Sequence, residues 1–437
     1  MTRHSLLLVI GAVAGLVWAN LDPGSYARVI HAPLSFNGWI GRDYAHWAAA
    51  YGPAHQSFQI GDVRWVLTPH YLINDLAMAL FFAFAGKEVW EAVSLPNGSL
   101  RGRKAATPLV ATAGGVVGPA AIYLLLAALV GGGAFDSLAG GWAVPTATDI
   151  AFSYLLGRMI FGERHPALRF LLLLAIADDA AGLAILAVFY PSEELALHWL
   201  LLSGAAAFGA YAIFNWLPRR LDGNDPLGPR ATATRLRFGL WPYMLAGALS
   251  WYGFARSGLH PALALLPIIP AIPQAERELG LFHEAEQYLG DLLNRLGRRL
   301  RTPVEVILML FGLANAGIDL AAPSTATALV LAGLLLGKPL GIAAAGWLAA
   351  CPLGLGLPPG MRLRDLPVLG STAAVGFTVS LFIAGIAFPP GAVQEAAKMG
   401  ALLSFLAVPG AILLARLCRV RKQTGAASPT SQSRTGH

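Results

Sequence analysis

Long apolar runs alternate with short polar segments along almost the whole chain, a pattern typical of a membrane protein. Many runs approach or exceed about 18 residues, the length that crosses the hydrocarbon core of a bilayer, and about twelve spans are expected. We expect these spans at residues 5–20, 69–93, 106–131, 142–157, 168–190, 196–216, 237–254, 258–271, 303–320, 325–347, 367–388 and 394–416. The pattern predicts an all-α polytopic fold with one transmembrane domain over residues 1–422.

Two segments outside the spans have a pattern of their own. In the long loop after the first span, residues 57–66 form two short strand-like runs around Gly61-Asp62, which predicts a β-hairpin covering one mouth of the protein or contacting a second subunit. Residues 423–437 are rich in Ser, Thr and Gly, which predicts a disordered cytoplasmic tail.

Composition and charge agree with a membrane location. Hydrophobic residues make up 56% of the 437-residue chain and charged residues only 13%, against about 25% charged residues in soluble domains. The net charge is +7, but the basic residues are spread over short loops rather than gathered in a patch, so no nucleic-acid partner is expected. Two cysteines give no disulfide framework.

The distribution of Lys and Arg predicts the orientation. If the N-terminus is cytoplasmic, the loops on that side hold most of the basic residues, as the positive-inside rule requires. The outer loops then hold only Arg28, Arg42, Arg64 and Arg256. Both termini are therefore expected in the cytoplasm.

Two adjacent aspartates, Asp178 and Asp179, lie in the middle of the apolar span 168–190. A carboxylate at the centre of a bilayer costs about 2.5–3.5 kcal/mol on insertion scales, and such residues usually face a cavity that conducts ions or protons. Consecutive helical residues point about 100° apart, so one carboxylate can face an ion path while the other faces a neighbouring helix. The alternative is an inert acid satisfied by hydrogen bonds.

The span 142–157 is predicted to be an interrupted helix. Pro145, followed by Thr146, Thr148 and Asp149, breaks the apolar run with a missing backbone donor and hydroxyl side chains. Freed carbonyls and the threonine hydroxyls can coordinate a small cation, and Asp149 can offset the positive end of the half-helix that follows. The alternative is an ordinary N-cap at a late helix start.

A lysine lies at depth in the tenth span. Lys338 is followed by Pro339 and has apolar stretches of similar length on both sides. It either extends toward the membrane surface or pairs with a carboxylate of another helix, for which Asp178 and Asp179 are the candidates. Such a pair suits the coupling of proton and cation binding.

Residues 370–385 of the eleventh span repeat the small and hydroxylated pattern of the fourth. The third to fifth spans run in reverse order to the tenth to twelfth, so the two interrupted helices occupy matching positions. This arrangement is typical of inverted repeats with crossing broken helices and a binding site at the midplane.

Taken together, several strings resemble the NhaA family of sodium/proton antiporters. They occur in family order at residues 72–82, 145–152, 175–179, 257–260, 314–317, 337–342 and 376–384. The resemblance implies a secondary transporter of the bacterial inner membrane rather than an enzyme. It implies alternating access, electrogenic exchange of exported Na⁺ or Li⁺ for imported H⁺, and a role in pH and sodium homeostasis. No cofactor is expected.

The resemblance also implies residue roles. Asp179 would be the principal ligand of the transported Na⁺ or Li⁺, with Thr148 and Asp149 beside it. Asp178 would pair with Lys338, and this pair with Asp179 would exchange protons against the cation. The outer hairpin, residues 57–66, would be a homodimer contact.

The chain departs from the family at the residues linked to pH response. Residues 294–305 are rich in arginine and lack the family's histidine there. Glu88 matches a family acid, but it follows Lys87, so a local ion pair is an alternative to a sensor role. His260 matches a family position and is either part of the pH response or a structural histidine.

Rival functions make different demands on the same residues. An intramembrane aspartyl protease needs two carboxylates that share one water, which adjacent residues on one helix do not provide. A sodium-coupled symporter of related architecture would need an organic-substrate pocket. A channel would not need the counter-charge of Lys338.

Overall fold

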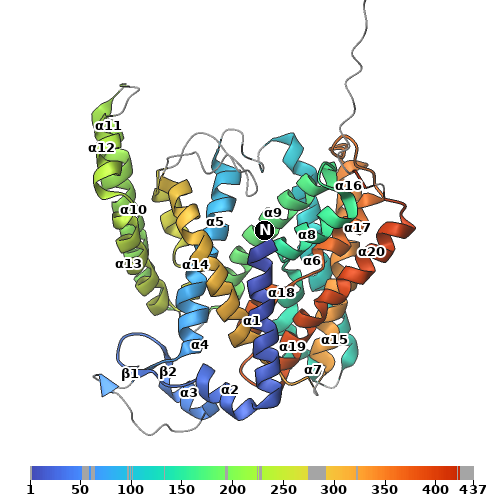
Figure 1. Cartoon of the computed structure of the whole chain (residues 1–437), viewed down its shortest axis with the longest axis horizontal. Coiled ribbons are helices and arrows are strands. Elements are labelled where there is room, and N and C mark those ends of the chain that lie inside the picture. Colours follow the sequence, from blue (N-terminus) through green and yellow to red (C-terminus); the bar gives the residue numbers. More distant parts are fainter. Residues whose placement is uncertain are drawn as a thin grey trace, which may run out of the picture.

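The computed structural model of the chain is mostly helical (Figure 1). It describes residues 2–51, 59–60, 64–95, 98, 100, 102–131, 133–191, 195–223, 225, 229–273, 292–320, 323–420 and 422–423. Residues 424–437, and with them nearly all of the expected tail, lie outside the described residues.

The helices coincide with most of the expected apolar runs. In the first half they are α1 (Thr2–Leu21), α2 (Pro23–Ile30), α3 (Tyr44–Tyr51), α4 (Pro69–Tyr71), η1 (Leu72–Ala77), α5 (Met78–Ser94), α6 (Arg103–Val130), α7 (Ala134–Leu138), η2 (Ala139–Thr146), α8 (Ile150–Phe161) and α9 (Pro166–Phe189). In the second half they are η3 (Leu197–Trp199), α10 (Leu200–Tyr211), η4 (Ala212–Trp216), α11 (Leu217–Asp222), α12 (Pro229–Phe238), α13 (Trp241–Ser257), η5 (Pro261–Leu263), η6 (Leu266–Ala271), α14 (Leu292–Asn315), α15 (Thr325–Ala332), η8 (Gly333–Gly337), α16 (Lys338–Ala350), α17 (Asp365–Ala373), α18 (Phe377–Ala387), α19 (Ala392–Leu403), η9 (Ser404–Leu406) and α20 (Ala407–Leu417).

Several of these helices can cross a membrane. Among the described residues, five continuous helical stretches are long and apolar enough: Ala105–Val130, Pro166–Phe189, Leu197–Asp222, Thr325–Ala350 and Ala392–Leu417. A sixth candidate is the pair α17 and α18, which is bent by 55° at a short break. Exposed leucines and valines on the outside of the helices, such as Val117, Leu125 and Leu413, suit contact with lipid.

Two expected helices differ from the structure for local reasons. Residues 258–271 form the 3₁₀ turns η5 and η6 instead of one α-helix, because the prolines at 261, 267 and 270 remove backbone donors. The helix expected at 303–320 begins earlier, at Leu292. The basic stretch before Pro303 is also helical, because Leu292 and Leu293 are buried and anchor it to the core.

The predicted hairpin is wrong in its strand pairing. The described strands are β1 (Ser35–Asn37), β2 (Arg42–Asp43), β3 (Gln59–Ile60) and β4 (Trp65–Leu67), and they form a sheet in the order β2-β4-β1-β3. The earlier strand β1 lies between β3 and β4, parallel to β3 and antiparallel to β4. The turn at Gly61-Asp62 lies outside the described residues.

Glycine contacts hold two helix pairs close together. A Cβ on Gly114 of α6 would collide with the carbonyl oxygen of Gly341 in α16, and one on Gly118 would lie 2.5 Å from that of Gly337. A Cβ on Gly11 of α1 would likewise collide with the carbonyl oxygen of Met309 in α14. Small residues at four-residue spacing allow this backbone approach in membrane helices.

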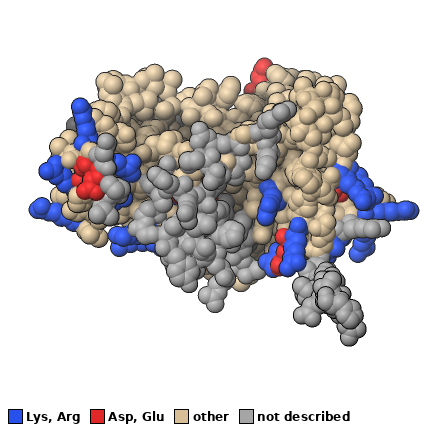
Figure 2. Space-filling view, turned by 90° about the horizontal axis from the view of Figure 1, so that it is seen from above, with Lys and Arg blue, Asp and Glu red and all other residues tan. Residues whose placement is uncertain are grey.

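The sheet marks one end of the molecule, called here the sheet end, with α2 and α3 beside it (Figure 1). Figure 2 looks onto the opposite end, where Lys and Arg side chains gather over α11 and α12 and outnumber the acids in view. These helices carry Arg219, Arg220, Arg235 and Arg237 in their last turns.

Candidate cation-binding site

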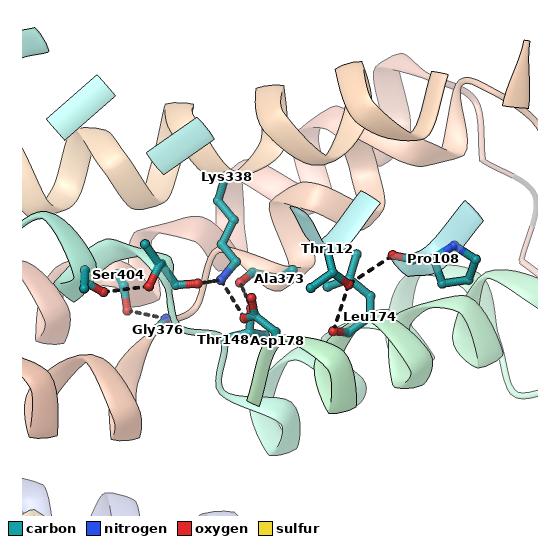
Figure 3. Close-up of polar contacts among 11 residues, drawn as sticks. Pro108, Thr112, Thr148, Leu174, Asp178, Lys338, Ala373, Gly376 and Ser404 are labelled. Carbon is teal, nitrogen blue, oxygen red and sulfur yellow. Dashed lines mark hydrogen bonds and ion pairs between the residues drawn. The ribbon is translucent and has the colours of Figure 1, made fainter. Parts of the chain in front are cut away.

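Two broken helices cross at their breaks. The extended residues 147–149, between η2 and α8, lie against Ala373, the last residue of α17, and against residues 374–376, between α17 and α18. The backbone N–H of Asp149 donates to the carbonyl of Val375 at 2.7 Å, and Thr148 Oγ1 donates to the carbonyl of Ala373 at 3.1 Å (Figure 3). Backbone groups freed by one break thus bond to the other.

Asp149 connects the start of both half-helices. Its Oδ1 accepts hydrogen bonds from the N–H groups of Ala151 at 3.1 Å and Phe152 at 3.3 Å, which makes it the N-cap of α8. Its Oδ2 accepts from the N–H of Thr378 at 3.3 Å and from the Thr378 hydroxyl, in the first turn of α18. One buried carboxylate therefore faces the positive ends of two helices.

Lys338 reaches the same crossing from α16. Its Nζ donates to Asp178 Oδ2 at 2.9 Å and to the carbonyl of Thr146, at the C-terminal end of η2 (Figure 3). The side chains of Lys338 and Asp178 are 0% and 1% exposed. The π-helical turn η8 ends directly before Lys338 and accommodates Pro339. Removing either partner would leave the other charge buried and unpaired.

Asp179, the next residue of α9, does not take part in the ion pair with Lys338. It makes no hydrogen bond or ion pair within the described part of the chain. Both aspartates line a cavity of about 10 Å³, which is about the space of one water molecule. Its other lining residues are Phe81, Phe82, Ala85, Ala147, Gly182, Leu183 and Val379.

The second oxygen of Asp178 also lacks a partner in the part of the chain that the structure describes. There Asp178 Oδ1 is buried with no hydrogen bond, although Oδ2 accepts one from Lys338. A buried carboxylate oxygen without a donor is costly, so it requires a proton, a water or a cation. The cavity therefore combines two carboxylates, one of them balanced by a lysine.

A threonine of α6 contacts the backbone of α9 one helical turn before the aspartates. The single hydroxyl hydrogen of Thr112 is shared between the carbonyl of Pro108 in the same helix, at 3.0 Å, and the carbonyl of Leu174, at 3.3 Å and one helical turn before Asp178 (Figure 3). The structure thus brings Asp178, Asp179, Thr148, Asp149 and Lys338 to one region.

Glu88 and His260 lie outside this region. Lys87 Nζ is 3.3 Å from Glu88 Oε1 and 3.0 Å from Glu91 Oε2, so the local pairing considered for Lys87 and Glu88 is present. His260 Nδ1 accepts from the N–H of Ala262 at 3.2 Å and caps η5, while its Nε2 lies 3.7 Å from Asp75 Oδ1. Both residues have local structural partners.

Thr378 is the residue that sequence reasoning missed as part of the site. It lies in the hydroxylated stretch of the eleventh span, but its bond to Asp149 joins residues 229 positions apart. The sequence signal for this contact is the position of Thr378 in the first turn after a predicted helix break, where backbone N–H groups need acceptors.

Comparisons with known proteins decide the family. The model of the family described as Na⁺/H⁺ antiporter 1 matches residues 1–414. The chain belongs to this family. It is 59% identical over 424 residues to the Na⁺/H⁺ antiporter NhaA of Jannaschia sp. (strain CCS1), covering 97% of this chain and 98% of that protein.

A second relative and a solved structure are less similar to the chain. The NhaA antiporter of Geobacter metallireducens is 41% identical over 426 residues, with 97% of this chain and 98% of the relative covered. Among solved structures, the sodium proton antiporter MjNhaP1 of Methanocaldococcus jannaschii superposes with a TM-score of 0.41 at 15% identity, over 78% of this chain and 84% of that one. Membership of the Na⁺/H⁺ antiporter 1 family makes the chain a multi-pass membrane protein.

Proposed function

We propose that this protein is a secondary antiporter that exports Na⁺ in exchange for H⁺. The observation that carries the proposal is Asp179: a carboxylate without a partner among the described residues, at a cavity it shares with the lysine-paired Asp178, beside two crossed helix breaks. The family it belongs to is named for this exchange. The protein is accordingly a transporter rather than an enzyme.

Charge balance at the site explains why cation and proton compete. With Lys338 and Asp178 paired, Asp179 adds one uncompensated negative charge inside the membrane domain. Either a proton or a sodium ion neutralises it, and each excludes the other. Asp178 Oδ1 supplies a second oxygen ligand, and the Thr148 hydroxyl lies at the same break.

Lys338 lets the exchange involve more than one proton. When a cation draws on both carboxylates of the cavity, the attraction that holds Asp178 to Lys338 weakens, and the ammonium can release its proton. When the cation leaves, Lys338 and Asp179 are both free to take protons again. This is the basis for electrogenic exchange, with Li⁺ as an alternative to Na⁺.

Asp149 holds the two helix breaks together and is not the principal ligand of the cation. Its two oxygens each accept hydrogen bonds from a different half-helix, so it holds α8 and α18 together while the cation is exchanged. We assign Asp149 a positioning role beside the cation, and Asp179 the role of principal ligand.

The paired geometry does not suit an aspartyl protease. The Oδ2 of Asp178 accepts from Lys338, so the two aspartates do not share one water symmetrically.

We further propose the topology expected from the sequence: about twelve spans in the bacterial inner membrane, both termini cytoplasmic, and inverted repeats that carry the broken helices. The arginines over α11 and α12, at the end opposite the sheet, favour a cytoplasmic location for that end. Alternating access of the site to the two sides would complete the cycle.

A homodimer through the sheet is proposed in place of the hairpin contact. Among the described strands β3 lies at the edge of the sheet, and a sheet edge is suited to adding a strand from a second copy. Deleting residues 57–66 should shift the purified protein from dimer to monomer while exchange stays measurable. A dimer that survives the deletion would refute the contact.

Everted membrane vesicles test the exchange itself. Sodium added to vesicles with a pre-formed pH gradient should collapse the gradient, as a pH-sensitive dye reports. Asp179→Asn should abolish this response, because its amide neither binds Na⁺ as a charge nor exchanges a proton at this site. Glu163→Gln is the matched control, since Glu163 is exposed and paired with Arg158. Sodium-driven proton flux that persists in Asp179→Asn would reject the ligand assignment.

A further inference from the structure

An apolar groove of about 300 Å³ lies between η8, α16, α17 and α20, and is called here the α20 groove. Its lining residues are different from those of the cavity at Asp179. Among the described residues that line it, only Ser371 has a polar side chain, and its hydroxyl donates to the carbonyl of Pro367 at 3.0 Å. The side chains therefore offer no free hydrogen-bonding group, so an apolar occupant is suited to this groove.

Small residues of α20 create the hollow. Ala407 and Gly410 line it, and a Cβ on Gly410 would meet nothing within 4 Å. Leu413 and Leu417 of the same helix also line it, and each is more than half exposed. The groove is therefore open to the surroundings of the helices, which in a membrane domain are lipid chains.

The length of the groove matches one leaflet of a bilayer. Its lining residues extend from Leu406 to Leu417, which is about 16 Å along the chain at the helical rise of 1.5 Å per residue. The hydrocarbon core is about 30 Å thick, so one leaflet takes up about half of it. The acyl chain of a single lipid therefore fits along α20.

Basic residues gather where α17 begins and α20 ends. Met361 and Leu366 pack in one cluster with Leu414 and Cys418, so these two helix ends lie together. Figure 2 shows Lys and Arg side chains at the right of the molecule, the side on which α17 and α20 lie in Figure 1. The exposed or half-buried basic residues next to the packed ends are Arg362, Arg364, Arg416 and Arg419.

Acidic residues do not balance this charge. Residues 338–373 and 407–420 contain a single acid, Asp365. Its side chain is buried, and its Oδ2 accepts a hydrogen bond from the backbone N–H of Arg362 at 2.8 Å. This end of the groove therefore attracts a negatively charged group.

Arg364 has a free donor at this end. Its Nε is buried and makes no hydrogen bond in the described structure. Arg364 has helical backbone angles and precedes Ser371 by two helical turns, so both residues lie on one face of α17. A buried donor without an acceptor is costly, and a phosphate matches the fork of N–H groups on a guanidinium.

We propose that the α20 groove binds one anionic phospholipid, with phosphatidylglycerol as the representative lipid. Its acyl chain would lie along α20, and its phosphate would accept hydrogen bonds from Arg364. A zwitterionic lipid can fill the same groove but lacks the net negative charge that the basic end attracts. A free phosphate lacks the chain that the apolar groove requires.

The bound lipid would contact the outside of the helix crossing. Pro339, directly after Lys338, and Ala374, at the break between α17 and α18, both line the groove. A Cβ on Gly370 would lie 2.7 Å from the Cα of Pro339, so α17 meets α16 at this level. The lipid would therefore stabilise the packing around the crossing; an effect on exchange rests on the proposed function, whereas the binding itself does not.

Photochemical labelling of the full-length protein tests the binding. The purified protein is placed in phosphatidylcholine vesicles with a trace of phosphatidylglycerol or phosphatidylcholine that carries a diazirine on the acyl chain, and labelled peptides are mapped by mass spectrometry. The phosphatidylglycerol probe should label residues 406–417 roughly tenfold more than the phosphatidylcholine probe, since a charge-assisted hydrogen bond is gained. Glycerol 3-phosphate should not compete. Equal labelling by the two probes, or competition by glycerol 3-phosphate, would overturn the proposal.

Variants locate the site without measuring transport. Gly410→Leu should lower the labelling of residues 406–417 by roughly tenfold, because the new side chain displaces several buried CH₂ groups of the lipid. Gly204→Leu in α10 is the matched control, because a Cβ there also meets nothing within 4 Å, and it should label like the wild type. Labelling that survives Gly410→Leu would refute the groove as the site.

A charge variant decides separately, including the case in which Gly410→Leu does not fold. Arg364→Gln should reduce labelling by the phosphatidylglycerol probe to the level of the phosphatidylcholine probe. Arg158→Gln is its control, because Arg158 is exposed and already paired with Glu163. A preference for phosphatidylglycerol that persists in Arg364→Gln would contradict the headgroup assignment.

Discussion

Asp149→Asn is the most informative perturbation of the helix crossing. The asparagine can keep one oxygen toward Ala151 and Phe152, but its amide then faces Thr378, whose N–H loses its acceptor. Leaving a buried donor unsatisfied costs about 1–3 kcal/mol. Losing the charge at two helix starts costs about 0.3–1 kcal/mol each. We expect a total loss of about 2–5 kcal/mol in the free energy of unfolding.

A double-mutant cycle with Thr378→Val separates the shared interaction from general damage. That change removes the hydroxyl donor to Asp149 but keeps the backbone N–H. Because both single variants lose the same bond, the double variant should be less destabilised than their sum by about 1–2 kcal/mol.

Thermal midpoints at a fixed heating rate, measured by size-exclusion chromatography of heated samples, give the order of stability. Asp136→Asn, in the exposed first turn of α7, is the matched control and should melt like the wild type. Strict additivity of Asp149→Asn and Thr378→Val would show that the two breaks are not joined through this carboxylate. So would a wild-type midpoint for Asp149→Asn.

Two further predictions concern other charged groups. Lys338→Ala should destabilise the protein by about 3–5 kcal/mol and alter the pH profile of vesicle exchange, because Asp178 is left buried without its counter-charge; an unchanged midpoint and profile would contradict the pairing. His31, whose pKa is lowered to about 4 in the folded protein, binds fewer protons than in the unfolded chain between pH 6.5 and 4. The free energy of unfolding should therefore decrease as the pH is lowered from 6.5 to 4, by at most about 1.4 kcal/mol per pH unit. His31→Asn in gluconate buffer should flatten this decrease; identical pH curves for the variant and the wild type would refute the prediction.

Helix positions and breaks were predictable because they depend on local composition. Apolar length fixed most spans, and Pro145 and the small residues near Gly376 predicted the two breaks. The 3₁₀ turns at Pro261–Leu263 and Leu266–Ala271 depart from the apolar pattern because closely spaced prolines override it. The sheet order was not predictable, since β1 is only three residues long and carries no alternating pattern.

The site was predictable in its chemistry but not in its contacts. A buried lysine needs a carboxylate, so Lys338 pointed to the aspartate pair, yet the choice of Asp178 depends on which face of α9 meets α16. The bond from Thr378 to Asp149 depends on how two distant breaks cross, which local sequence does not encode. Long-range contacts of this kind require the assembled fold.

The glycine contacts restrict how the molecule can move. At Gly114 and Gly341, and again at Gly11 and Met309, there is no side chain between the two main chains, so neither helix of a pair can slide or rotate without collision. α6 and α16 must then travel as one rigid body that includes Lys338, and α1 and α14 as another. Any conformational cycle has to be accommodated elsewhere in the molecule, for example between α5 and α18, where the rings of Phe82 and Phe382 meet edge to face.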